Sequence, residues 1–93
     1  MILSAGAVAP AIEAALEARQ PTDEQIVRVV DSFIQEAVAK GEWPNISFIR
    51  YHQALYNIDP TKYVANMDDV YRLYTPHGWD VRVYRENVVM KKQ

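Results

Sequence analysis

The sequence predicts a small α+β domain in which helices precede a C-terminal β-hairpin. Residues 23–40 repeat apolar side chains at helical spacing, whereas residues 79–90 alternate apolar and polar side chains as strands do. The length of 93 residues suits one domain, so we assign residues 1–93 to a single domain. The apolar content of 49% and the charged content of 24% are typical of globular proteins and argue against general disorder.

The N-terminal segment is expected to begin flexibly and then to form a short helix. Residues 1–9 are small and apolar, which predicts flexibility. Pro10 suits the first position of a helix, so the predicted helix covers residues 10–20. So short a helix is unstable alone, and we expect it to dock on its own domain or on a second copy. The N-terminus has no basic region, so we reject a signal peptide and expect a cytoplasmic location.

The strongest helix prediction covers residues 23–40. Thr22 and Gln25 have the spacing of a capping box, and the two residues after Thr22 are acids that the helix dipole favours. Gly41 follows the last periodic residue and suits a left-handed helix cap.

The segment after this helix fits two patterns. Residues 46–50 alternate as a strand does, which favours a strand leading into a helical turn. A helix over 46–57 capped by Asn45 is the alternative, and the second half of the segment favours helix. The side chains at helical spacing are Phe48, Tyr51, Leu55 and Ile58.

The Asp-Pro pair at 59–60 predicts the start of another helix, which extends to about Tyr74 or restarts at Asn66. Asp68 and Arg72 are four residues apart and are expected to pair on its surface. One apolar stripe is expected along the helix, formed by Tyr63, Met67, Val70, Tyr71 and Tyr74.

The closing segment predicts a two-stranded hairpin. Residues 85–87 provide the reversal and residues 88–90 return. One face is expected to hold Trp79, Val81 and Val83, and the other Asp80, Arg82 and Tyr84. A lone hairpin is marginal in water, so it must pack on the helices or gain a third strand. If residues 46–50 are a strand, the sheet is three-stranded and antiparallel; if they are helical, the domain resembles a winged helix.

The residue types needed for catalysis are not arranged as an active site. The chain has no cysteine, and His52 and His77 stand in no metal-ligand spacing. No serine lies in a Gly-x-Ser-x-Gly motif, and the isolated glycines form no phosphate-binding loop. We therefore expect no enzymatic activity, no metal and no cofactor. No apolar run has the length of a membrane-spanning helix, so we expect no membrane partner.

Two sequence runs resemble a family. "IQEAVAKG", followed by an apolar stretch, and "DDVYRLYTPHGWDV", followed by a short strand, resemble small accessory proteins encoded by tailed bacteriophages. Their usual pattern is a helix ending in Ala-x-x-Gly, a strand, a helix, and a Gly-aromatic-x-Val run that opens a hairpin. The match covers residues 24–90, and the stretch 51–65 is longer here than in those proteins. The resemblance implies a small α+β fold and a phage origin, and it implies no activity.

Arginines that neighbour aromatic residues are the candidate binding residues, because such pairs stack on planar groups and contact partners. The candidates are Trp43, Arg50, Tyr51, Arg82, Tyr84 and Arg85. They favour a non-catalytic binding protein that self-associates or inhibits a host factor by protein–protein interaction, in the host cytoplasm if the chain is phage-encoded. One alternative is a protein that sequesters a nucleotide. The other is a winged-helix-like DNA-binding regulator with residues 60–75 as recognition helix, which the net charge of −2 opposes.

Overall fold

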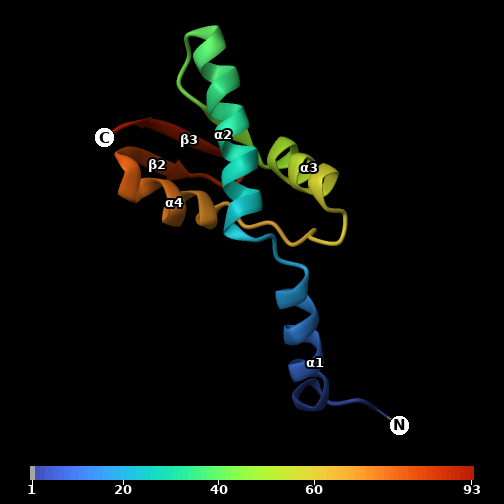
Figure 1. Cartoon of the computed structure of the whole chain (residues 1–93). Helices are drawn as coiled ribbons and strands as arrows, with labels where there is room; N and C mark the ends of the chain where they lie inside the picture. The colour runs from blue at the N-terminus through green and yellow to red at the C-terminus, as the bar shows by residue number, and fades with distance from the viewer. Residues whose placement is uncertain (1) are drawn as a thin grey trace.

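The computed structural model describes residues 2–93, and within them four α-helices accompany a three-stranded antiparallel sheet (Figure 1). The helices are α1 (Ala5–Ala18), α2 (Asp23–Lys40), α3 (Phe48–Ile58) and α4 (Asp68–Tyr74). The strands are β1 (Asn45–Ser47), β2 (Trp79–Val83) and β3 (Asn87–Lys92), and a 3-10 turn, η1 (Thr75–His77), precedes β2. The predicted α+β class and the C-terminal hairpin are confirmed.

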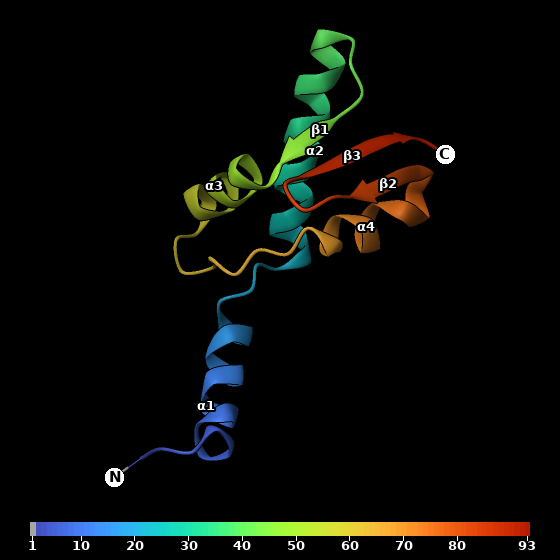
Figure 2. The ribbon, with the colours of Figure 1, turned by 180° about the vertical axis from the view of Figure 1, so that it is seen from behind.

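The sheet has the strand order β1-β3-β2, so the hairpin gains its third strand from the segment after α2. Ile46 lies opposite Val88, and Val81 lies opposite Met90, which sets the register of the two ladders. Figures 1 and 2 show α2 crossing one face of the sheet, while the opposite face carries no helix. Of the predicted inner face, Val81 is buried, whereas Val83 lies near the hairpin turn and is exposed.

Helix α2 begins and ends as its sequence predicts. The Thr22 hydroxyl accepts the backbone N–H of Gln25 at 3.2 Å, and the Gln25 side chain accepts the Thr22 N–H at 2.9 Å. These reciprocal bonds satisfy two N–H groups that a helix start otherwise leaves without partners. Gly41 ends the helix at φ +68°, the left-handed conformation that glycine adopts without steric cost.

The ambiguous segment forms both a strand and a helix. β1 ends at Ser47, and α3 begins at the next residue because the Ser47 hydroxyl accepts the Arg50 N–H at 3.2 Å. The helix cap is therefore Ser47 rather than Asn45. Asn45 instead lies at the start of β1, where its side chain accepts a 2.8 Å bond from Asn87.

The predicted helix over 60–75 is wrong in its first half. The Asp59 carboxylate accepts both the Thr61 N–H, at 3.0 Å, and the Thr61 hydroxyl, at 2.6 Å. Such a local bond competes with helix formation, and the chain stays irregular until Asn66 accepts the Asp68 N–H at 2.9 Å. The restart at Asn66 was the better prediction.

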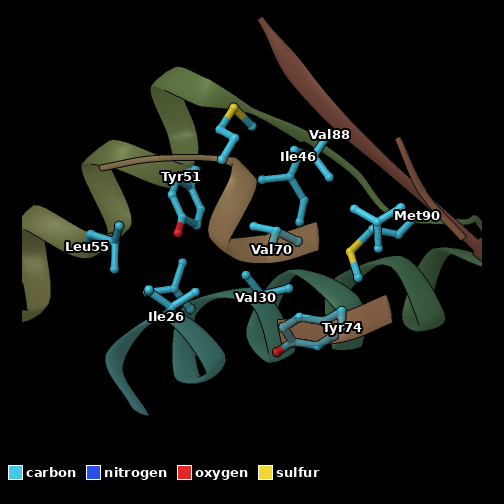
Figure 3. Close-up of a cluster of buried hydrophobic side chains, with 12 residues drawn as sticks. Ile26, Val30, Ile46, Tyr51, Leu55, Val70, Tyr74, Val88 and Met90 are labelled. Atoms are coloured by element: carbon cyan, nitrogen blue, oxygen red, sulfur yellow. The ribbon is translucent and has the colours of Figure 1, made fainter. Parts of the chain in front are cut away.

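The core lies between α2, α3, α4 and the inner face of the sheet (Figure 3). Its buried side chains are Ile26, Val29, Val30, Ile46, Tyr51, Leu55, Met67, Val70, Tyr74, Val81, Val88 and Met90. Two members of the predicted stripe, Tyr63 and Tyr71, are exposed instead. Tyr63 precedes the shortened helix, which removes it from the helical register of the other residues.

Helix α1 starts earlier than predicted and stands apart from the core. It begins at Ala5, where the Ser4 hydroxyl accepts the Ala7 N–H at 3.3 Å, so Pro10 lies inside the helix rather than at its start. No residue of α1 is buried. Figures 1 and 2 show it projecting from the domain, and with α1 included the extents are 59 × 25 × 21 Å. The radius of gyration, 15.8 Å, exceeds the roughly 12 Å of a compact domain of this length.

Candidate functional site

The six candidate binding residues do not form one site. Tyr51 is fully buried in the core, so its expected role on a binding surface is wrong. Arg85 is exposed in the hairpin turn between β2 and β3. The others divide between the outer face of the sheet and the C-terminal end of α2.

Tyr51 is buried because its position on α3 faces α2 and α4. Its hydroxyl has no hydrogen-bond partner among the residues that the structure describes. Burial raises the pKa of the Tyr51 hydroxyl well above its ordinary value of 10. The sequence alone does not decide whether Tyr51 is buried. Tyr51 shares helical spacing with Phe48 and Leu55, but it also fits the alternating pattern of a strand.

The outer face of the sheet carries a small hollow of about 240 Å³, lined by Asp80, Arg82, Tyr84, Val89 and Lys91. Arg82 Nε lies 3.6 Å from Asp80 Oδ2, and Asp80 pairs in register with Lys91 across the hairpin. Arg82 and Tyr84 therefore share a surface as the sequence suggested. An acid lies between the two cations, so the hollow is only weakly basic.

Arg50 occupies a different surface and is already engaged by its own chain. Its Nη2 lies 3.2 Å and 3.1 Å from the two carboxylate oxygens of Glu36 on α2, and its guanidinium stacks 5.0 Å from the centre of the Phe33 ring. Hydrogen bonds from Lys40 and from Arg50 lower the pKa of Glu36. Arg50 thus joins α3 to α2 through one guanidinium nitrogen, and its side chain stays 56% exposed.

Two tryptophans meet at the end of α2. The rings of Trp43 and Trp79 are edge to face, with centroids 6.3 Å apart and an interplanar angle of 87°. Trp43 follows α2, and Trp79 opens β2 after Gly78, whose φ of +84° turns the chain out of η1. The pair therefore depends on two turns that only glycine makes readily.

Beside this pair lies a shallow hollow of about 350 Å³, which we call the Trp43 surface. It is lined by Ile34, Val38, Gly41, Glu42, Trp43, Pro44 and Trp79. Val38 is 73% exposed and Trp43 is 54% exposed, although both are large apolar side chains. The only charged lining residue is Glu42. Trp43 is the only residue of this surface that the sequence analysis names as a candidate binding residue. Val38 is not named there, although its position off the buried stripe of α2 could have indicated that it is exposed.

The outward face of α4 is acidic. Arg72 Nη2 lies 2.7 Å from Asp23 Oδ1 and 3.2 Å from Asp69 Oδ1, and Asp68 is exposed nearby. The predicted pair of Asp68 with Arg72 is replaced by these two contacts. The hydrogen bond from Arg72 lowers the pKa of Asp23. The one basic side chain of α4 is thus neutralised by two carboxylates.

Residues 2–93 contain no cluster of three or more histidine and acidic side chains that could hold a metal ion. Over the same residues, no helix is long and apolar enough to cross a bilayer. No protein-family model, no curated protein sequence and no solved structure matches the chain.

Proposed function

We propose that this chain is a non-catalytic protein-binding module whose Trp43 surface receives an apolar segment of a partner protein. The observation that carries the proposal is that two exposed apolar side chains, Val38 and Trp43, line the same hollow. Leaving large apolar side chains in water is unfavourable, and an exposed group of apolar side chains is characteristic of interaction sites. Tryptophan is also among the residues that contribute most to binding at interfaces.

The charge of the hollow specifies the partner further. Glu42 is its one charged lining residue, so the partner segment is expected to combine apolar anchors with a lysine or arginine that reaches Glu42. The biological role that we propose is inhibition: the chain would bind such a segment of a host protein and block it. The Trp43 surface and the resemblance to phage proteins both support this role.

A DNA-binding role receives less support. The order of α2, β1, α3, α4 and the hairpin resembles a winged helix, in which α4 would enter the DNA groove. Asp23 and Asp69 pair with the one arginine of α4, Asp68 is exposed on the same helix, and carboxylates repel phosphates.

A nucleotide-sequestering role also receives less support. The outer hollow of the sheet, at about 240 Å³, is smaller than the roughly 300–1,000 Å³ of typical ligand pockets. Its Arg82 is close to Asp80, which competes with a phosphate for the guanidinium.

The test is selection of a random 12-residue peptide library on the full chain, followed by affinity measurements on synthetic copies of the recovered peptides. We expect peptides with apolar anchors and a basic residue that bind Trp43→Ala at least 10-fold more weakly than wild type. Tyr84→Ala is the matched control, since Tyr84 is an exposed aromatic residue outside the hollow, and it should bind normally. Recovery of no peptide, or equal binding to Trp43→Ala and wild type, would overturn the proposal. A gel shift with duplex DNA and thermal-shift measurements with nucleotides test the two alternatives.

A further inference from the structure

Helix α1 displays apolar side chains that no other element among residues 2–93 covers. Ile12 is 53% exposed and Leu16 is 46% exposed, and Ala5, Val8 and Ala9 lie on the same face of the helix. This stripe follows the spacing of a helix that packs on another element. No element of the domain covers it, as Figures 1 and 2 show.

The base of α1 is nevertheless fixed. Lys62 Nζ donates to the carbonyl of Ala18 at 2.8 Å, and the Val64 N–H donates to the carbonyl of Arg19 at 3.2 Å. Arg19 Nε also donates to the Tyr63 hydroxyl at 3.1 Å, with its guanidinium 5.6 Å from the centre of that ring. These contacts direct α1 away from the domain, so folding back onto it requires that they break.

Helix α1, at 14 residues, is of marginal stability without an element packed on its apolar face. Isolated helices of fewer than about 12–15 residues are marginal in water, and Gly6 and Pro10 weaken this one further. We infer that α1 pairs with the α1 helix of a second copy of this chain, and that the two helices run antiparallel.

The distribution of charge selects the antiparallel direction. Residues 5–12 are uncharged, and Glu13 and Glu17 lie in the second half of the helix. Antiparallel pairing sets these acids beside the N-terminal half of the partner helix, where the dipole favours negative charge. Parallel pairing sets the acids of the two copies beside one another. The alanines of the stripe also allow the two backbones to approach closely.

The contact area sets the strength of the pair. A helix of 14 residues is about 21 Å long, so one helix pair buries less than the roughly 800 Å² per partner of a standard interface. The dimer should therefore dissociate on dilution rather than persist at all concentrations.

Sedimentation velocity of the full chain over a 100-fold range of concentration tests the inference. We expect a monomer–dimer equilibrium in wild type, and a monomer throughout for Ile12→Glu. Ala14→Glu is the matched control: it adds the same charge on the opposite face of α1 and should dimerise as wild type does. A wild type that stays monomeric, or an Ile12→Glu variant that still dimerises, would refute the pairing. Trp43→Ala should dimerise normally, which separates this test from that of the proposed function.

Cross-linking tests the direction, and the absence of native cysteine makes it specific. Ala5→Cys and Leu16→Cys chains are mixed and oxidised, and the products are separated by mass. The antiparallel pair predicts mainly the mixed 5–16 disulfide. A predominance of 5–5 and 16–16 products would show a parallel pair and overturn the inferred direction.

Discussion

Arg72 Nη2 lies 2.7 Å from Asp23 Oδ1, which joins α4 to the first residue of α2 across 49 positions of sequence. The same guanidinium contacts Asp69, one turn away on α4, at 3.2 Å. Asp23 also occupies the first turn of α2, where the dipole favours an acid. One carboxylate thus supports a helix terminus and a contact between two helices.

Replacing Arg72 by alanine should lower stability slightly and make it less sensitive to salt. Both carboxylates lose their cation, but Arg72 and Asp23 are exposed and Asp69 is only partly buried, so water and ions screen much of the loss. The measurement is the melting temperature at 20 mM and 500 mM NaCl. Arg28→Ala is the control, because Arg28 is exposed on α2 and none of the described ion pairs includes it. Equal salt responses in Arg72→Ala and wild type would contradict this reading.

The elements predicted correctly depend on local chemistry. The capping box at Thr22, the left-handed Gly41 and the alternation of residues 79–83 each need only a few neighbouring residues. Local chemistry also explains why the predicted helix does not form over residues 60–67. A hydrogen bond between Asp59 and Thr61 competes with the helix, and the spacing of apolar residues does not reveal this bond.

The functional surfaces were predictable only in part. Trp43 could be suspected from its position after a helix, but its contact with Trp79 joins residues 36 positions apart and depends on the fold. Tyr51 and Tyr63 each stand at helical spacing with apolar residues in the sequence. Tyr51 is buried because it faces the packed helices, whereas Tyr63 does not and is exposed. The docking role expected for the N-terminal helix stays a prediction.

Acidification should destabilise the domain below about pH 4. Arg72 lowers the pKa of Asp23 from 3.8, Lys40 and Arg50 lower that of Glu36 from 4.5, and bonds from Thr61 lower that of Asp59 from 3.8. A carboxyl whose pKa is lower in the folded state stabilises it above its unfolded pKa, and this contribution is lost as pH falls. Urea midpoints between pH 6 and pH 3 measure the loss, and Glu36→Gln should flatten the curve. A midpoint that does not change over this range would be inconsistent with these contacts.

Substituting alanine for two glycines should have opposite effects. Gly41 has φ +68°, so Gly41→Ala places a side chain in the left-handed region. We expect this to lower the free energy of unfolding by about 1–2 kcal/mol, and each kcal/mol lowers the melting temperature by about 4–8 °C. No atom lies within 4 Å of the added carbon, so the cost is conformational. Gly6 lies within α1, and Gly6→Ala should increase helical content in circular dichroism by favouring that helix. A neutral Gly41→Ala would show that the end of α2 can adopt another cap.

Two buried tyrosines should respond differently to the loss of their hydroxyl groups. The Tyr74 hydroxyl donates to Asp31 Oδ1 at 2.6 Å, so Tyr74→Phe should lower the free energy of unfolding by about 1–2 kcal/mol. The Tyr51 hydroxyl is buried without a protein partner among residues 2–93, so Tyr51→Phe should leave stability unchanged or raise it by about 1 kcal/mol.

Urea denaturation of both tyrosine variants at pH 7 compares them directly. Each variant removes one hydroxyl group from a tyrosine ring in the same core. Burial raises the pKa of both hydroxyl groups, so in wild type the stability should also fall as pH rises above about 10, where the unfolded chain ionises first. A Tyr51→Phe variant less stable than Tyr74→Phe would show that the Tyr51 hydroxyl has a stabilising contact that outweighs the bond to Asp31.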